Sequence, residues 1–119
     1  MIKKTTQGEF NTFKREFLRW AEILNLKQYR YYFILKPLDD CFGQIVISEE
    51  GSVATVYLNA NLDTQDTDCW EGPKTTAKHE AIHLLLHRLY WLGTERFAGS
   101  GELHHEWEHL TMILEKVIK

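Results

Sequence analysis

The chain has 119 residues, of which 44% are hydrophobic and 26% charged, as in an ordinary soluble globular protein. This length suits a single domain spanning residues 1–119. A formal net charge of −3 without any cluster of lysines and arginines argues against a nucleic-acid-binding surface. No apolar run has the length of a membrane span or follows Met1 as in a secretory signal, so we expect a cytoplasmic protein with no membrane partner.

The first expected element is a helix from about Glu9 to Leu24. Thr6 and Glu9 have the spacing of a capping box, in which each side chain bonds to the backbone N–H of the other residue. Bulky apolar residues then recur at helical spacing and form one face. They are Phe10, Phe13, Phe17, Trp20, Ala21 and Leu24. Such a face is typical of a helix that packs on a core.

Three strand-like runs follow, at Tyr31–Lys36, Phe42–Ser48 and Val53–Asn59. Short connections rich in turn-forming residues separate them, which predicts a mainly antiparallel meander. Apolar residues occupy both parities in the second run, at positions 45–47. We therefore expect helices to cover both faces of the sheet, at least in part.

The most informative stretch is His79-Glu80-Ala81-Ile82-His83, within a run from Pro73 to Leu92 that contains no helix-breaking residue after its first turn. On a helix, His79 and His83 stand one turn apart on the same face, so both imidazoles can bind one zinc ion. Glu80 points about a hundred degrees away, where it can reach a water on the metal without being a ligand. This HExxH pattern supplies two ligands and a general base from one turn.

The context of the motif matters because the helix is expected to be buried. Its apolar residues form one broad arc on a helical wheel. They are Ala81, Ile82, Leu84, Leu85, Leu89, Trp91 and Leu92. Buried histidines and glutamates are costly without partners, which favours a metal site. The alternative is a core helix whose polar side chains are satisfied by backbone groups or water.

A catalytic zinc needs a third protein ligand, and the helix expected from Glu102 to Ile118 is its source. Apolar residues gather on one face of that helix, and Glu106 is the charged residue that falls among them. The face consists of Leu103, Trp107, Leu110, Ile113, Leu114, Val117 and Ile118. Glu106 is therefore the predicted third ligand. His105 and His109 are the next candidates, and a boundary glutamate that reaches out to solvent is the alternative.

An HEAIH helix followed by a loop and a glutamate-bearing helix resembles the gluzincin branch of zinc metallopeptidases, in particular its minimal phage and prokaryotic members. The resemblance implies a zincin-like α+β domain with an N-terminal helix, a three-stranded mainly antiparallel sheet, the HExxH helix and a C-terminal glutamate-bearing helix. It also implies Zn²⁺ held by His79, His83 and Glu106, with Glu80 as the general base. The implied partner is a peptide or protein substrate.

Two further parts of a peptidase site are left open by the residues. The oxyanion of the tetrahedral intermediate needs a donor besides the metal, and His87, Tyr90, His104 and His105 are all candidates. In the proteins that the chain resembles, an edge strand holds extended substrate by main-chain hydrogen bonds. We expect Val53–Asn59 to be that strand.

Two other functional classes remain. The domain could bind zinc for a regulatory or interaction role without turnover, although Glu80 then has no purpose. The chain could also be an interaction protein without a metal. A DNA-linked protease of the SprT-like kind resembles the chain through HExxH alone, and the basic surface expected of it is missing. Cys41 and Cys69 have no CxxC spacing and are expected to be free thiols without a role.

Overall fold

The computed structural model describes residues 4–62, 70–94 and 99–118. Three strands form one sheet: β1 (Arg30–Lys36), β2 (Gly43–Ser48) and β3 (Val53–Asn59). The helices in the described residues are α1 (Gln7–Ile23), α2 (Pro73–Thr94) and α3 (Ser100–Val117). The α+β class is thus confirmed, and the observed bounds lie within a few residues of the expected ones. Among the described residues, no helix is both long and apolar enough to cross a membrane.

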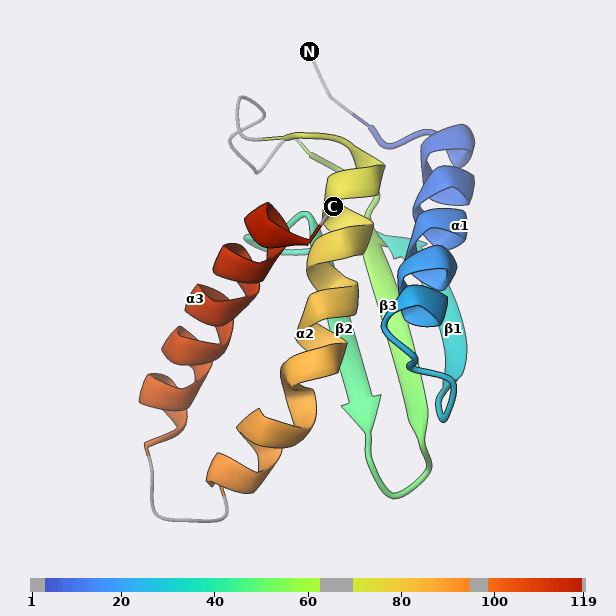
Figure 1. Cartoon of the computed structure of the whole chain (residues 1–119). Coiled ribbons are helices and arrows are strands. Elements are labelled where there is room, and N and C mark those ends of the chain that lie inside the picture. Colours follow the sequence, from blue (N-terminus) through green and yellow to red (C-terminus); the bar gives the residue numbers. More distant parts are fainter. Residues whose placement is uncertain (1–3, 63–69, 95–98, 119) are drawn as a thin grey trace.

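The strand order differs from the expected meander. The order is β1-β3-β2, with β1 parallel to β3 and β2 antiparallel to β3. The connection between β1 and β2 spans residues 37–42, which is long enough to pass over one strand position. Val53–Asn59 is therefore the central strand, and its expected place at the edge of the sheet is wrong. The strand at the edge beside the HExxH helix is β2 (Figure 1).

The two helices that were expected to sandwich the sheet lie on the same face of it (Figure 1). In the register of the sheet, Val56 of β3 stands between Phe33 of β1 and Ile45 of β2, and Val56 is fully buried beneath the helices. The alternate residues point away; those of the outer strands β1 and β2 are exposed, among them Tyr32 and Val46. The expectation that helices cover both faces of the sheet is therefore wrong, because apolar residues on the second face remain in contact with solvent.

Helix α1 behaves as its sequence predicts. Thr6 and Glu9 form the capping box, with the Glu9 N–H donating to Thr6 Oγ1 at 3.1 Å and the Thr6 N–H donating to Glu9 Oε1 at 3.0 Å. The aromatic face is buried against the sheet and α2. For example, the ring of Phe17 meets Phe33 edge to face at 5.6 Å.

Helix α2 lies between the other two helices, with α1 on one side and α3 on the other (Figure 1). Its first half is buried as expected: Ala81 and Ile82 have no exposed surface and Leu84 has almost none. In the second half, Leu85 and Leu89 are exposed. The expectation of a helix that is buried along its whole length is therefore wrong for its C-terminal turns.

Helix α3 is rotated about its own axis by about a quarter of a turn relative to the orientation expected from its apolar residues. Thr111 is fully buried, whereas Ile113 and Val117 are exposed. Glu106 lies on the exposed side with them, so its expected place on the buried face is wrong. Since α3 packs mainly on α2, aromatic and polar contacts with α2 decide which face turns inward.

The structure describes one of the two cysteines, Cys41. Cys41 is a free thiol on the segment between β1 and β2. The pKa of its thiol is raised, mainly by burial and to a smaller extent by the carboxylates of Glu80, Asp40 and Asp39. Cys69 lies outside the described residues.

Candidate metal centre

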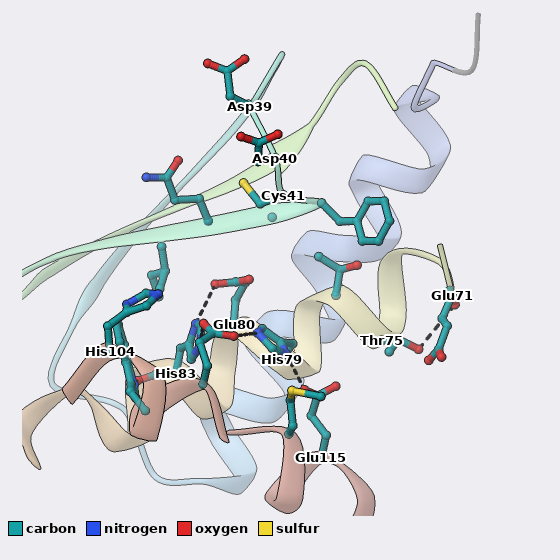
Figure 2. Close-up of a pocket in the computed structure, with 18 residues that line it drawn as sticks. Asp39, Asp40, Cys41, Glu71, Thr75, His79, Glu80, His83, His104 and Glu115 are labelled. Carbon is teal, nitrogen blue, oxygen red and sulfur yellow. Dashed lines mark hydrogen bonds and ion pairs between the residues drawn. The ribbon is translucent and has the colours of Figure 1, made fainter. Parts of the chain in front are cut away.

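A cleft of about 860 Å³ runs between β2 on one side and helices α2 and α3 on the other (Figure 2). The HExxH turn lies at its base, and the segment that leads into β2 forms the opposite wall. Among the described residues that line the cleft there are six carboxylates and no lysine or arginine. They are Asp39, Asp40, Glu71, Glu80, Glu108 and Glu115. A cleft with this charge balance favours a cation.

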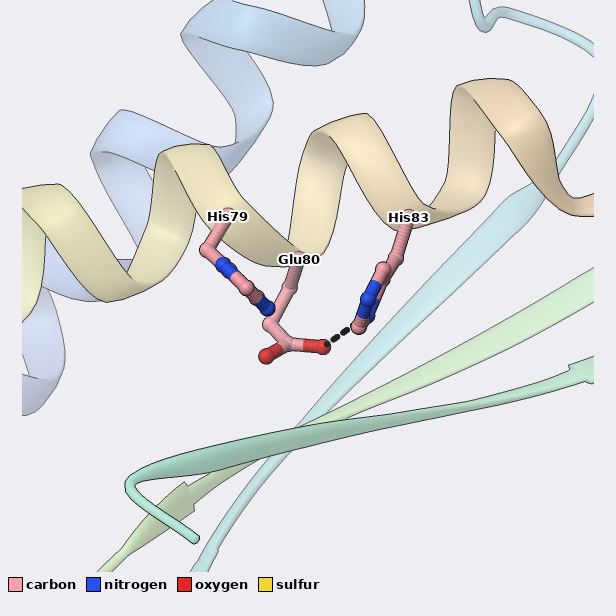
Figure 3. A group of neighbouring side chains, drawn as sticks. All are labelled: His79, Glu80 and His83. Atoms are coloured by element: carbon pink, nitrogen blue, oxygen red, sulfur yellow. Dashed lines mark hydrogen bonds and ion pairs between the residues drawn. The ribbon is translucent and has the colours of Figure 1, made fainter. Parts of the chain in front are cut away.

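The side chains of His79, Glu80 and His83 converge on the cleft side of α2 (Figure 3). One potential ligand atom from each lies within 4.8 Å of the other two. The two imidazole rings are 4.5 Å apart, as the one-turn spacing requires. Glu80 and His83 are buried, with 4% and 7% of their surfaces exposed. The structure therefore brings together the three residues of the motif.

Glu108 of α3 completes this group. Its Oε1 lies 2.6 Å from Nε2 of His83, and its Oε2 lies 3.5 Å from Nε2 of His79. Nε2 of His83 is buried and makes no hydrogen bond of acceptable geometry, in spite of the short distance to Glu108. Two imidazole nitrogens and one carboxylate are the donor types of a catalytic zinc site. The side chains thus fit a zinc ion.

The structure does not bring Glu106 to this group. The side chain of Glu106 is 59% exposed, and its Oε1 lies 3.8 Å from Nδ1 of His109 on the outer face of α3. His105 and His109 are exposed as well, and none of these three residues lines the cleft. The rotation of α3 accounts for this, because it turns residues 104, 108 and 115 toward the cleft in place of residue 106.

Charge interactions stabilise the group when no metal is bound. Burial alone would lower the pKa of His79, but hydrogen bonds with Glu108 and Glu115 outweigh it and raise that pKa to about 10. The pKa of His83 is raised as well, because Glu108 and Glu80 outweigh the effect of burial. The two nearby histidines, His79 and His83, lower the pKa of Glu108. The histidines therefore hold protons that a metal ion would displace.

Trp107 fixes the position of α3 beside the motif. Its indole N–H donates a hydrogen bond to the backbone carbonyl of His83 at 3.0 Å. The indole ring also lies 4.4 Å from the ring of His83 and stacks on Tyr90 at 4.5 Å. Since Glu108 follows Trp107 directly, this contact places the carboxylate opposite the histidines.

Asn59 fixes the opposite wall, a role that its place at the end of a strand did not reveal. Its side chain accepts from the Leu38 N–H at 3.0 Å and donates to the carbonyls of Leu38 at 3.1 Å and Cys41 at 2.8 Å. Asn59 is fully buried at the end of β3. It therefore holds the segment before β2 in the position that walls the cleft.

The four candidates for an oxyanion donor occupy different places. His104 lines the cleft, whereas His87, Tyr90 and His105 do not. Nε2 of His87 lies 3.4 Å from Glu49 Oε1, and burial lowers the pKa of this histidine despite the nearby carboxylate. Tyr90 packs on Trp107, and His105 is exposed on the outer side of α3. The geometry favours His104.

Comparisons of the chain with protein-family models, with curated proteins and with solved structures find no match. The case for a function therefore rests on the chemistry of the cleft.

Proposed function

We propose that the protein is a zinc-dependent peptidase that hydrolyses peptide bonds in the cleft between β2 and the helices α2 and α3. The observation that carries the proposal is the position of Glu108, whose carboxylate faces Nε2 of both His79 and His83. With Glu80 in the same turn, the cleft contains two imidazoles and two carboxylates close to one another. Glu108 replaces Glu106 as the proposed third ligand.

The residues of the cleft divide into those that would hold zinc and those that act on the substrate. His79, His83 and Glu108 would hold the ion. When bound, zinc lowers the pKa of a coordinated water and polarises a carbonyl oxygen. One anionic and two neutral ligands leave a net positive charge at the site, which suits this chemistry.

Glu80 acts as the general base. Its side chain is buried in the cleft, 5% exposed, with Oε1 3.4 Å from Nδ1 of His83. A purely structural site has no use for a carboxylate at this position. In the proposed reaction, Glu80 takes a proton from the attacking water and passes it to the amine that leaves.

His104 and the edge strand β2 bind the substrate. His104 is on the α3 side of the cleft, from which its imidazole donates a hydrogen bond to the developing oxyanion. Phe42, Gly43, Gln44 and Ile45 line the opposite side. Within the described part of the chain, β2 has a strand neighbour on one side only. An extended peptide can pair with the free edge of β2 by main-chain hydrogen bonds, which makes β2 the candidate for the role first given to Val53–Asn59.

The test combines zinc content with hydrolysis. Purified protein is loaded with zinc and incubated with a mixture of unstructured peptides, whose cleavage is followed by mass spectrometry. We expect one zinc per chain and cleavage products in the wild type. The variant Glu80→Gln should keep the zinc and lose cleavage by a factor of at least about 100, since its amide cannot take a proton.

Each failure has a different meaning. If the wild type binds no zinc, the metal site itself is contradicted. If the wild type binds zinc but cleaves no peptide, the zinc-binding domain without turnover becomes the better reading. If Glu80→Gln cleaves as fast as the wild type, Glu80 is not the base.

A further inference from the structure

We propose that Glu115 of α3 is a positioning residue for the metal centre, which holds the imidazole of His79 so that its Nε2 faces Glu108. This inference rests on the proposed function and extends it to a residue beyond the HExxH turn. It makes α3 the source of both a ligand and the group that orients another ligand.

The two ring nitrogens of His79 have different partners. Nδ1 contacts Oε1 of Glu115 (Figure 2). Nε2 is 3.5 Å from Oε2 of Glu108. An imidazole that binds a metal through one nitrogen keeps its proton on the other. A carboxylate that accepts the Nδ1–H therefore fixes the tautomer and the rotation of the ring, and it makes Nε2 a stronger donor to the metal.

The main chain of Glu115 is anchored at the same point. The ammonium group of Lys78 donates hydrogen bonds to the carbonyls of Glu115 and Ile118 at the C-terminal end of α3. Lys78 precedes His79 directly, so neighbouring residues of α2 hold both the carbonyl and the carboxylate of Glu115. The ammonium group also lies 5.2 Å from the centre of the Trp20 ring of α1. These contacts hold Glu115 in place more firmly than a single ion pair on the surface would.

The spacing of Glu108 and Glu115 on α3 allows one to act as a ligand and the other to orient His79. Glu108 and Glu115 are seven residues apart, which is two helical turns, so both carboxylates point to the same side of α3. The side chain of Glu115 is 18% exposed and that of Glu108 is 36% exposed. Glu106 on the outer face of the same helix is 59% exposed and provides a matched control.

The experiment measures the zinc affinity of the full chain by competition with a chromophoric chelator. The variants are Glu115→Gln, Glu115→Ala, Glu108→Gln and the control Glu106→Gln. Glu115→Ala should still bind one zinc, with an affinity that is roughly 10–100-fold weaker than in the wild type. Glu115→Gln keeps a neutral acceptor for the Nδ1–H of His79. Its zinc affinity should therefore lie between those of the wild type and Glu115→Ala. Glu106→Gln should bind zinc as the wild type does.

The visible absorption spectrum of the Co²⁺-loaded protein separates positioning from ligation. We expect the wild-type spectrum in both Glu115 variants and a changed spectrum in Glu108→Gln, since only the latter loses a ligand. The free energy of unfolding of the metal-free variants is measured in parallel. If Glu115→Ala does not fold, Glu115→Gln decides, because it preserves the volume of the side chain.

Two results overturn the inference while leaving the proposed function intact. One is a zinc affinity in Glu115→Gln and Glu115→Ala equal to that of Glu106→Gln. The other is a changed Co²⁺ spectrum in the Glu115 variants with the wild-type spectrum in Glu108→Gln, which would make Glu115 the ligand. A wild type that binds no metal would instead contradict the proposed function itself.

Discussion

The carboxylate of Glu108 lies 2.6 Å from Nε2 of His83, although the two residues belong to different helices and are separated by 25 positions along the chain. The hydrogen bond from the Trp107 indole to the backbone of His83 holds the two helices at this point. Glu106, one residue before Trp107, projects to the opposite side of α3. The contact of Trp107 with α2 therefore distinguishes the two glutamates.

Zinc titration of four alanine variants tests this distinction. Glu108→Ala should lose zinc affinity by more than the roughly 10–100-fold typical of residues that only hydrogen-bond to a ligand, because a ligand itself is removed. Glu106→Ala should bind zinc as the wild type does, and so should His105→Ala and His109→Ala. Loss of zinc in Glu106→Ala with Glu108→Ala unaffected would return the third ligand to the position that the apolar pattern predicts.

The HExxH turn was predictable because its geometry is local. Once residues 73–94 form a helix, His79 and His83 must share a face, whatever the rest of the chain does. The third ligand depends instead on how α3 rotates against α2. That rotation follows from the contacts of Trp107, Lys78 and Thr111, none of which the apolar pattern of α3 reveals.

The sheet shows the same limit. The three strands were expected within one residue of their observed starts, because alternation and turn residues are local signals. Their order was not predictable in this way, since a connection of six residues between β1 and β2 allows either neighbouring strands or a skipped position. The full burial of Ala54, Val56 and Leu58 is what a central strand requires.

Asn59 should be important for stability as well as for the shape of the cleft. Asn59→Ala leaves the Leu38 N–H and the carbonyls of Leu38 and Cys41 without their partner. We expect a loss of about 2–4 kcal/mol in the free energy of unfolding, since each buried unpaired group costs about 1–3 kcal/mol. Urea denaturation measures this loss. The exposed Asn11→Ala on α1 is the control, expected to stay within about 0.5 kcal/mol of the wild type. An equal effect of both variants would contradict this role of Asn59.

Tyr31 should make the fold sensitive to alkaline pH. Its hydroxyl donates to the carbonyl of Leu26, and burial, followed by the nearby Tyr29, raises its pKa from 10.0 to about 12. The folded state thus holds the proton more tightly than the unfolded state, so the contribution of Tyr31 is complete below pH 10 and is lost as the pH rises from about 10 to about 12. Urea denaturation across this range should show a smaller decline in Tyr31→Phe than in the wild type. Identical declines in both proteins would show that Tyr31 does not titrate in this way.

Gly43, the first residue of β2, should tolerate no side chain, because the strand passes close to α2 beside Glu80. A Cβ atom at this position would lie 2.7 Å from Cγ2 of Thr76, 3.2 Å from the carbonyl oxygen of Tyr57 and 3.4 Å from Oε2 of Glu80. Gly43→Ala must therefore push β2 away from α2. We expect a loss of about 1–3 kcal/mol in the free energy of unfolding, as for other overpacked sites. Peptide cleavage should fall as well, since β2 and Glu80 move apart.

A double-mutant cycle separates this clash from other effects of the substitution. Thr76→Ser removes Cγ2 but keeps the hydroxyl, which donates to the Gly72 carbonyl at 3.1 Å. Gly43→Ala should therefore cost less in the Thr76→Ser background than in the wild type, with a coupling of about 0.5–3 kcal/mol. Gly101→Ala is the control glycine, because a Cβ there meets no atom within 4 Å. Zero coupling between Gly43→Ala and Thr76→Ser would mean that the methyl group of Thr76 does not limit the approach of β2 to α2.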